Sequence, residues 1–142
     1  MAELFERTVL NGMELRNRFV HSATNEGSAR ADDGTVTDPL VHIQEELAQG
    51  EVALIIPGNM YVNMPGKSRP CQTGIHDDKT IPGLARMADA VHRHGACIVA
   101  QLAHAGANAY VPTGGDYALG PSDMKLTEIP SRAMTRDEIR DT

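Results

Sequence analysis

The sequence contains no tryptophan, only two cysteines and relatively few basic residues. Its 142 residues include 13 lysines and arginines against 19 aspartates and glutamates, a formal net charge of −6. Binding to phosphate backbones requires clustered basic residues, so this acidic balance argues against a nucleic-acid partner. Cys71 and Cys97 have neither a close pairing nor metal-ligand spacing, which fits a reduced, cytoplasmic compartment.

Long apolar runs and targeting signals are also missing. The N-terminal stretch MAELFERTVL has no basic segment followed by an apolar one, and the longest apolar run is far shorter than the roughly 20 residues of a membrane helix. We therefore expect neither export nor membrane insertion. A hydrophobic content of 41% is ordinary for a globular chain with a core.

Two common ligand-binding patterns are absent as well. His92 and His94 are two residues apart on an expected helix and do not share a face, so even with His76, Asp77 and Asp78 nearby we expect no metal site. No G-x-G-x-x-G motif follows the first expected strand, which argues against an open dinucleotide-binding sheet.

The first third of the sequence predicts a hairpin, a strand and a helix. The pair Asn11-Gly12 separates two short alternating segments and favours a tight turn. A first buried strand is expected near Phe19–Ala23. The following helix has Asp38 as its expected N-cap, Pro39 at its first position and Gly50 after its end.

The remaining segments continue the alternation. The apolar, β-branched run at 51–57 predicts a second buried strand, an amphipathic helix is expected over 81–94, and ACIVAQL at 96–102 predicts a third strand. Thr135 and Glu138 form a capping box for a third helix. Strands that alternate with helices indicate an α/β fold with a parallel sheet, either open and doubly wound or a barrel. An eight-stranded barrel takes about 250 residues, so we expect this chain to be an incomplete part.

Polar residues stand where the apolar runs end, and long connections follow at 57–80 and 102–134. In parallel α/β proteins of either arrangement, ligands bind at the carboxyl ends of the strands. The residues at these ends are Thr24 and Asn25, then Gly58 and Asn59, then Gln101 and His104. They offer neutral donors and acceptors and little charge, which suits the edge of a planar heterocycle such as a flavin better than a phosphate or a metal.

Four segments stand in a distinctive order and spacing: LFERTVLNGMELRNRFVHSATNEG, DGTVTDPLVHIQEELAQGEVALIIPGNMYV, GIHDDKTIPGLARMADAVHRHGACIVAQLAHAG, and PSDM before MTRDEI. In this order and spacing the chain resembles, over essentially its whole length, the N-terminal part of the old yellow enzyme family of flavin-dependent oxidoreductases. It implies that residues 1–142 are the N-terminal fragment of a single FMN-binding (β/α)8 TIM-barrel domain with an N-terminal β-hairpin. In such enzymes NADH or NADPH reduces FMN, and the flavin passes hydride to an activated alkene such as an enone, an enoate or a dienoyl-CoA.

The resemblance also implies roles for individual positions. Ala23, Thr24 and Asn25 would line the flavin near its N5 and O4 edge, Gly58 would approach it through its backbone, and Gln101 would bond the pyrimidine edge. His104 would face substrate or flavin, or else pack in the barrel mouth against backbone. Likewise, Gln101 could instead cap a loop and Asn25 could serve only as a turn former.

Departures from the family pattern and missing parts matter too. Many relatives have proline and methionine at Ala23 and Thr24, and arginine at Ala107. The family's catalytic residues and phosphate-binding loops come from later strands, so the resemblance implies no catalytic residue in this chain and no activity for the chain alone. The rest of the barrel, or a complementary or identical chain, is the expected partner. The alternative is a non-catalytic half-barrel that assembles with itself or a partner chain to cover its sheet edges.

Overall fold

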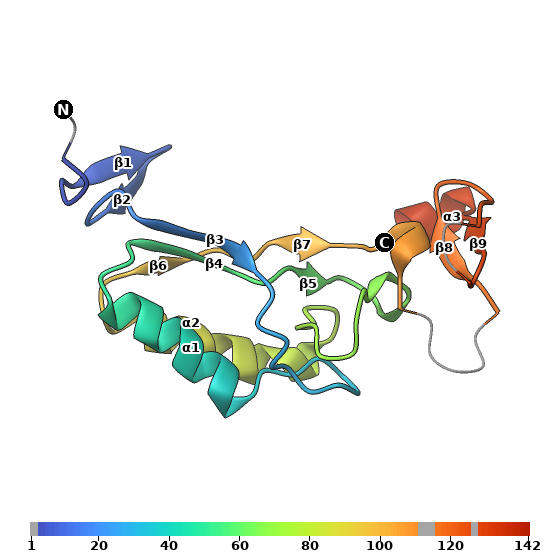
Figure 1. The fold of residues 1–142 in the computed structure, drawn as a ribbon, viewed down its shortest axis with the longest axis horizontal. Coiled ribbons are helices and arrows are strands. Elements are labelled where there is room, and N and C mark those ends of the chain that lie inside the picture. The colour runs from blue at the N-terminus through green and yellow to red at the C-terminus, as the bar shows by residue number, and fades with distance from the viewer. Residues whose placement is uncertain (1–2, 111–115, 126–127) are drawn as a thin grey trace.

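The computed structural model describes residues 3–110, 116–125 and 128–142. Figure 1 shows a central sheet with two helices side by side on one face. A hairpin lies at one end of the molecule, and a small unit built from β8, β9 and α3 lies at the other. Among the described residues, no helix is long and apolar enough to cross a membrane.

The hairpin predicted around Asn11-Gly12 is confirmed. Strands β1 (Thr8–Leu10) and β2 (Met13–Leu15) pair antiparallel, and the two turn residues have φ values of 46° and 87°. Leu15 is buried in a cluster with Ala53 and Leu54. The hairpin therefore packs on the amino-terminal end of the central sheet.

The predicted parallel sheet is confirmed. Strands β3 (Val20–Thr24), β4 (Leu54–Pro57) and β6 (Cys97–Ile98) are arranged in the order β3–β4–β6. Val20, Leu54 and Cys97 are in register and therefore point to the same face of the sheet. The first strand begins and ends one residue later than predicted.

The helices α1 (Asp38–Gln49) and α2 (Ile81–His92) cover the other face of the sheet. Ile55 of β4 packs there with Ala48 and Val91 in one buried cluster, and Val91 lies on the apolar face of the amphipathic helix that was predicted. The predicted N-cap was wrong. Thr37 caps α1 because its hydroxyl accepts from the backbone N–H of Leu40 and also donates to the carbonyl of Ser28. Asp38 is thus the first helical residue, and α2 ends two residues before the predicted position.

The third predicted strand, at 96–102, is divided in two. After β6 the chain leaves the ladder, and β7 (Leu102–Ala103) pairs instead with β5 (Met60–Tyr61) in a separate parallel pair. The two long connections are therefore more structured than predicted. They also contain η1 (Met64–Gly66), η2 (Asp78–Thr80), η3 (Gly106–Asn108), β8 (Ala118–Gly120) and β9 (Ser131–Ala133).

The C-terminal unit is built on a parallel pair of strands and a short helix. β8 pairs with β9, and α3 (Arg136–Arg140) follows. The capping box predicted from Thr135 and Glu138 is confirmed, because each side chain bonds the backbone N–H of the other residue. The guanidinium of Arg132 lies over the ring of Tyr117 and pairs with Glu138, which links β9 to α3.

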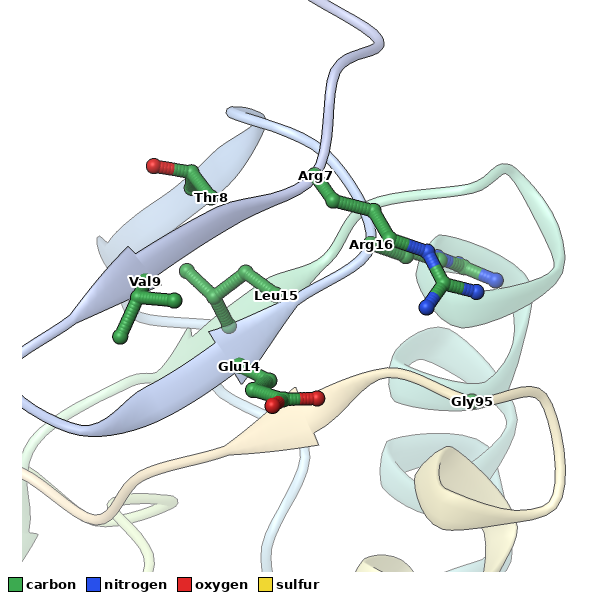
Figure 2. A pocket seen from close by; sticks show the side chains of 7 residues that line it. All are labelled: Arg7, Thr8, Val9, Glu14, Leu15, Arg16 and Gly95. Carbon is green, nitrogen blue, oxygen red and sulfur yellow. The ribbon is translucent and has the colours of Figure 1, made fainter.

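One arginine joins the hairpin to both helices. Arg16 donates to the carbonyls of His94 and Ala48 at 2.6 Å each, and to that of Val52 at 3.1 Å. These carbonyls lie at or just beyond the C-terminal ends of α1 and α2, where backbone acceptors lack helical partners. Figure 2 shows Arg16 beside Arg7 in a cavity of about 610 Å³ at this end of the sheet. This cavity lies at the opposite end of the strands from the predicted ligand site.

Candidate functional site

The carboxyl ends of β3 and β4 meet closely. Thr24 is opposite Pro57 in the ladder, and Gly58 follows at once. A Cβ atom on Gly58 would lie 2.9 Å from the carbonyl oxygen of Thr24 and 3.0 Å from the Cα of Asn25. Only a glycine allows this approach, so the structure brings these predicted site residues together.

A register shift distorts β3 just before its end. Between the paired residues His21 and Thr24, two residues of β3 stand opposite the single residue Ile56 of β4. One of the two is Ala23. Such irregularities re-aim side chains and are common beside functional sites. They therefore determine how Ala23 and Thr24 are presented at the strand end, and the hydroxyl of Thr24 donates back to the carbonyl of Ser22 at 3.0 Å.

Gln101 lies in the segment between β6 and β7. Its carbonyl accepts from the backbone N–H of Met60 at 2.8 Å, which places it beside the residues that follow Gly58. Its side chain is exposed and forms no hydrogen bond with the described residues, and the same is true of Asn25. The loop-capping alternative for Gln101 therefore finds no partner in this part of the chain. Both amides are free to meet a ligand.

His104 packs into the structure. Its Nδ1 accepts from the backbone N–H of Gly106 at 3.0 Å, and its ring lies against Gly66, where a Cβ would collide with it. Burial lowers the pKa of His104, which favours the neutral ring. Its Nε2 is buried and has no partner among the described residues. This geometry agrees with the packed alternative.

Glu26 is a site residue that sequence reasoning missed. Its carboxylate accepts from the backbone N–H of Gly58 at 3.2 Å and from the side-chain amide of Gln44 at 2.6 Å. The available signal was Gln44, a polar residue four positions after Leu40 on the core-facing stripe of α1. A buried amide requires a hydrogen-bond partner, and the partner comes from the loop after β3.

A second group of polar residues supports the connection after β4. Asn59, at the strand end, accepts from the amide of the buried Gln72 at 2.6 Å and is therefore turned into its own loop. In the same connection, Lys67 lies 5.3 Å from the ring centre of Tyr61 and donates to the carbonyl of Ala31. Burial raises the pKa of Tyr61 to about 12. In the described part of the chain, no three His, Cys, Asp or Glu side chains cluster to hold a metal ion.

An apolar cavity of about 530 Å³ lies nearby but apart from the strand ends. Its lining includes Met64, Lys67, Tyr110, Tyr117 and Leu119. None of the residues predicted to bind the cofactor contributes to it. The candidate site is therefore the carboxyl edge of the sheet, where Thr24, Asn25, Gly58 and Gln101 gather.

Relatives of known name cover this chain almost completely. It is 36% identical over 141 residues to a metal reductase of Desulforamulus reducens. This alignment covers 98% of this chain and 21% of that protein. It is 34% identical over 142 residues to an NADPH dehydrogenase of Halalkalibacterium halodurans, covering 99% of this chain and 41% of the relative. The chain thus spans between about a fifth and two fifths of these proteins.

Solved structures have the same fold. A 2-naphthoyl-CoA reductase in complex with 2-naphthoyl-CoA matches with a TM-score of 0.88 and 25% identity, over 97% of this chain and 23% of that one. The old yellow enzyme from Pichia sp. AKU4542 matches with a TM-score of 0.86 and 22% identity, over 97% of this chain and 39% of that one. The fold is therefore that of part of a (β/α)8 TIM barrel, as predicted.

A sequence profile of one family matches residues 3–142, nearly the whole chain. The hairpin, the parallel β3–β4–β6 sheet and the polar strand ends agree with that match. The chain belongs to the NADH:flavin oxidoreductase / NADH oxidase family.

Proposed function

We propose that this chain forms the N-terminal part of a single FMN-binding barrel domain. The complete protein would transfer hydride from NADH or NADPH, through FMN, to an activated alkene such as an enone, an enoate or a dienoyl-CoA. Membership of the family implies FMN, with NADH or NADPH as reductant. The observation that carries the proposal is the meeting of Asn25, Gly58 and Gln101 at one edge of a parallel sheet.

The donor set fits a flavin ring. Thr24, Asn25 and Gln101 are neutral and exposed, and the two amides each offer a donor and an acceptor without a partner among the described residues. An isoalloxazine edge presents alternating carbonyl and N–H groups, which a primary amide bonds in pairs. No residue of this set carries a positive charge, so the phosphate of FMN would be bound by other residues.

Each residue would have a distinct task. Ala23 and Thr24, presented by the irregularity of β3, and the following Asn25 would line the N5 and O4 edge, the part of FMN that would supply the hydride chemistry. Gln101 would bond the pyrimidine edge. Gly58 already donates its N–H to Glu26, so it would contribute close approach of the backbone and not a free donor.

The substrate class is supported by one structural neighbour. That protein is a 2-naphthoyl-CoA reductase in a soaked complex with 2-naphthoyl-CoA, an acyl thioester conjugated to unsaturated carbon. The relative from Desulforamulus reducens is a metal reductase, which offers a different acceptor to test. Anaerobic turnover of the full-length protein with cyclohexenone, a dienoyl-CoA and ferric iron would separate these acceptors. Reduction of ferric iron alone would refute the alkene assignment.

The cofactor proposal is tested by changing Gln101. In the full-length protein, Gln101→Leu removes the amide and is expected to raise the Kd for FMN about tenfold, or about 1.4 kcal/mol. Gln49→Leu is the matched control, since Gln49 is also exposed and forms no hydrogen bond with the described residues. Titration followed by flavin fluorescence gives both constants. Equal constants for the two variants would refute the role of Gln101, and a wild-type protein without FMN affinity would refute the function.

A second candidate function rests on exposed apolar side chains. Val20 is 50% exposed, Val99 43% and Leu102 63%, and Val20 points away from the helices. Such a surface requires a cover, which a second copy or another chain could supply. Sedimentation of the 142-residue chain without FMN would test this non-catalytic assembly. A monomer at micromolar concentration would refute it.

A further inference from the structure

The loop after β3 is held by a side chain. Among the described residues, no backbone–backbone hydrogen bond outside the strand ladders involves Glu26, Gly27 or Ser28. The carboxylate of Glu26 instead reaches two neighbouring elements. It accepts from the N–H of Gly58 after β4, at 3.3 and 3.2 Å to its two oxygens, and from Gln44 on α1.

The contact with α1 is short and buried. Gln44 is 0% exposed, and its amide nitrogen lies 2.6 Å from Oε1 of Glu26. If the amide of Gln44 were rotated by half a turn, its oxygen would face the carboxylate oxygen of Glu26, and two acceptors would meet. The carboxylate therefore determines the orientation of this amide. The other atom of the amide, Oε1 of Gln44, is buried without a partner among the described residues. Removing Glu26 would therefore leave the whole buried amide unpaired.

The contact with Gly58 leaves no room for a side chain at that position. A Cβ on Gly58 would lie 2.8 Å from Oε2 of Glu26 and 3.0 Å from the Cα of Asn25. The carboxylate thus lies directly against the backbone of one candidate flavin contact and is covalently next to another. A change in the shape or hydrogen bonding of Glu26 would therefore act on both Asn25 and Gly58.

The charge of this carboxylate has no cationic partner. No Lys, Arg or His nitrogen of the described residues lies within ion-pair distance of Glu26, and its recorded donors are the neutral amides of Gly58 and Gln44. A negative charge held by neutral donors in a partly buried place acts on its surroundings with little screening. Reduction adds negative charge to a flavin, so a nearby carboxylate opposes it.

We infer that Glu26 is a positioning residue of the flavin site, which fixes the ends of β3 and β4 against α1 and lowers the reduction potential of the bound cofactor. The inference rests on the proposed function, because it needs FMN at the edge formed by Asn25, Gly58 and Gln101. Its two parts, placement and charge, are separable, because glutamine preserves most of the shape of glutamate and none of its charge.

The experiment uses the full-length FMN-loaded protein with Glu26→Gln, Glu26→Ala and, as control, Glu46→Gln on the exposed side of α1. Dye equilibration gives the midpoint potential, and fluorescence titration gives the Kd for FMN. We expect Glu26→Gln to raise the potential by about 30 mV, a tenfold change in the equilibrium constant of a two-electron couple. Glu26→Ala is expected to raise the Kd about tenfold as well, and Glu46→Gln to change neither.

The outcomes separate the two ideas. If Glu26→Gln keeps the wild-type potential, the charge part is overturned, and if Glu26→Ala keeps the wild-type Kd, the placement part is overturned. In either case FMN binding by the wild type leaves the proposed function standing. A wild-type protein that binds no FMN overturns both. If Glu26→Ala fails to fold, the potential of Glu26→Gln decides, and a wild-type value for that variant overturns the inference.

Discussion

Arg16 holds the hairpin and both helices together, and replacing it should cost much of the stability of this region. Its two terminal nitrogens donate to the carbonyls of Ala48, Val52 and His94 at 2.6 to 3.1 Å. Hydrogen bonds from a charged donor contribute about 1.5–3 kcal/mol each. The three are not additive, and water from the adjoining cavity would replace part of them. We therefore expect Arg16→Met to lower the free energy of unfolding by about 3 kcal/mol, a large share of the roughly 5–15 kcal/mol of a domain.

Urea denaturation of the full-length protein measures this loss. With a slope of about 2 kcal/mol/M, the midpoint should fall by about 1.5 M. Arg7→Met is the matched control, because Arg7 lines the same cavity, is exposed and forms no hydrogen bond with the described residues (Figure 2). The control should stay within about 0.5 kcal/mol of the wild type.

A lysine at this position distinguishes charge from geometry. In the Arg16→Lys variant, the lysine ammonium is a single point charge. It cannot bond the carbonyls of His94 and Ala48 at once, as the forked guanidinium does. Its midpoint should therefore lie between those of the wild type and Arg16→Met. If Arg16→Met unfolds at the same urea concentration as Arg7→Met, the three bonds of Arg16 contribute no measurable stability, contrary to this prediction.

Three further outcomes concern pH and packing. The Arg132 guanidinium holds the pKa of Glu138 down to about 2. The stability from this ion pair is therefore fully present above 4.5, the pKa of Glu138 in the unfolded state, and is lost as the pH falls through about 2. Glu138→Gln should abolish this acid dependence, as measured by amide exchange of α3. Burial lowers the pKa of His104, so the stability contributed by its neutral ring is fully present above pH 6.5 and declines as the pH falls below that value. An NMR titration that gives the ring a pKa at or above 6.5 would contradict this. Gly58→Ala places a Cβ 2.8 Å from Oε2 of Glu26 and should destabilise the protein by about 1–3 kcal/mol. An unchanged urea midpoint would contradict this, because it would mean that the loop accommodates the methyl group without cost.

Local features of the fold were predictable because their causes lie within a few residues. Asn11-Gly12 takes positive φ with little strain, and the apolar stripes of α1 and α2 repeat at helical spacing. Strands that alternate with helices then require a parallel sheet. The meeting of Asn25 and Gly58 was predictable from the same rule, since β3 and β4 end at one edge. Gln101 lies beyond the end of β6 and is held beside that edge by the bond from the N–H of Met60 to its carbonyl.

Other features depended on contacts from elsewhere in the chain. Thr37 displaces Asp38 as the N-cap partly because its hydroxyl also bonds Ser28, nine residues earlier. The third strand divides because Met60 bonds the carbonyl of Gln101 and recruits the following residues to β5. Apolar residues continue from 96 to 100, so the pattern of that segment gives no sign of the break.

The sequence by itself determined the order of strands and helices and which edge of the sheet carries neutral polar groups, because hydrophobic periodicity and turn chemistry act locally. Only the tertiary structure decided how that edge is built. The donors to Glu26 come from residues 18 and 32 positions away, and the irregularity of β3 is visible only against β4. Hydrogen bonds between distant segments leave no periodic pattern in a chain, so they emerge only when the core brings those segments together.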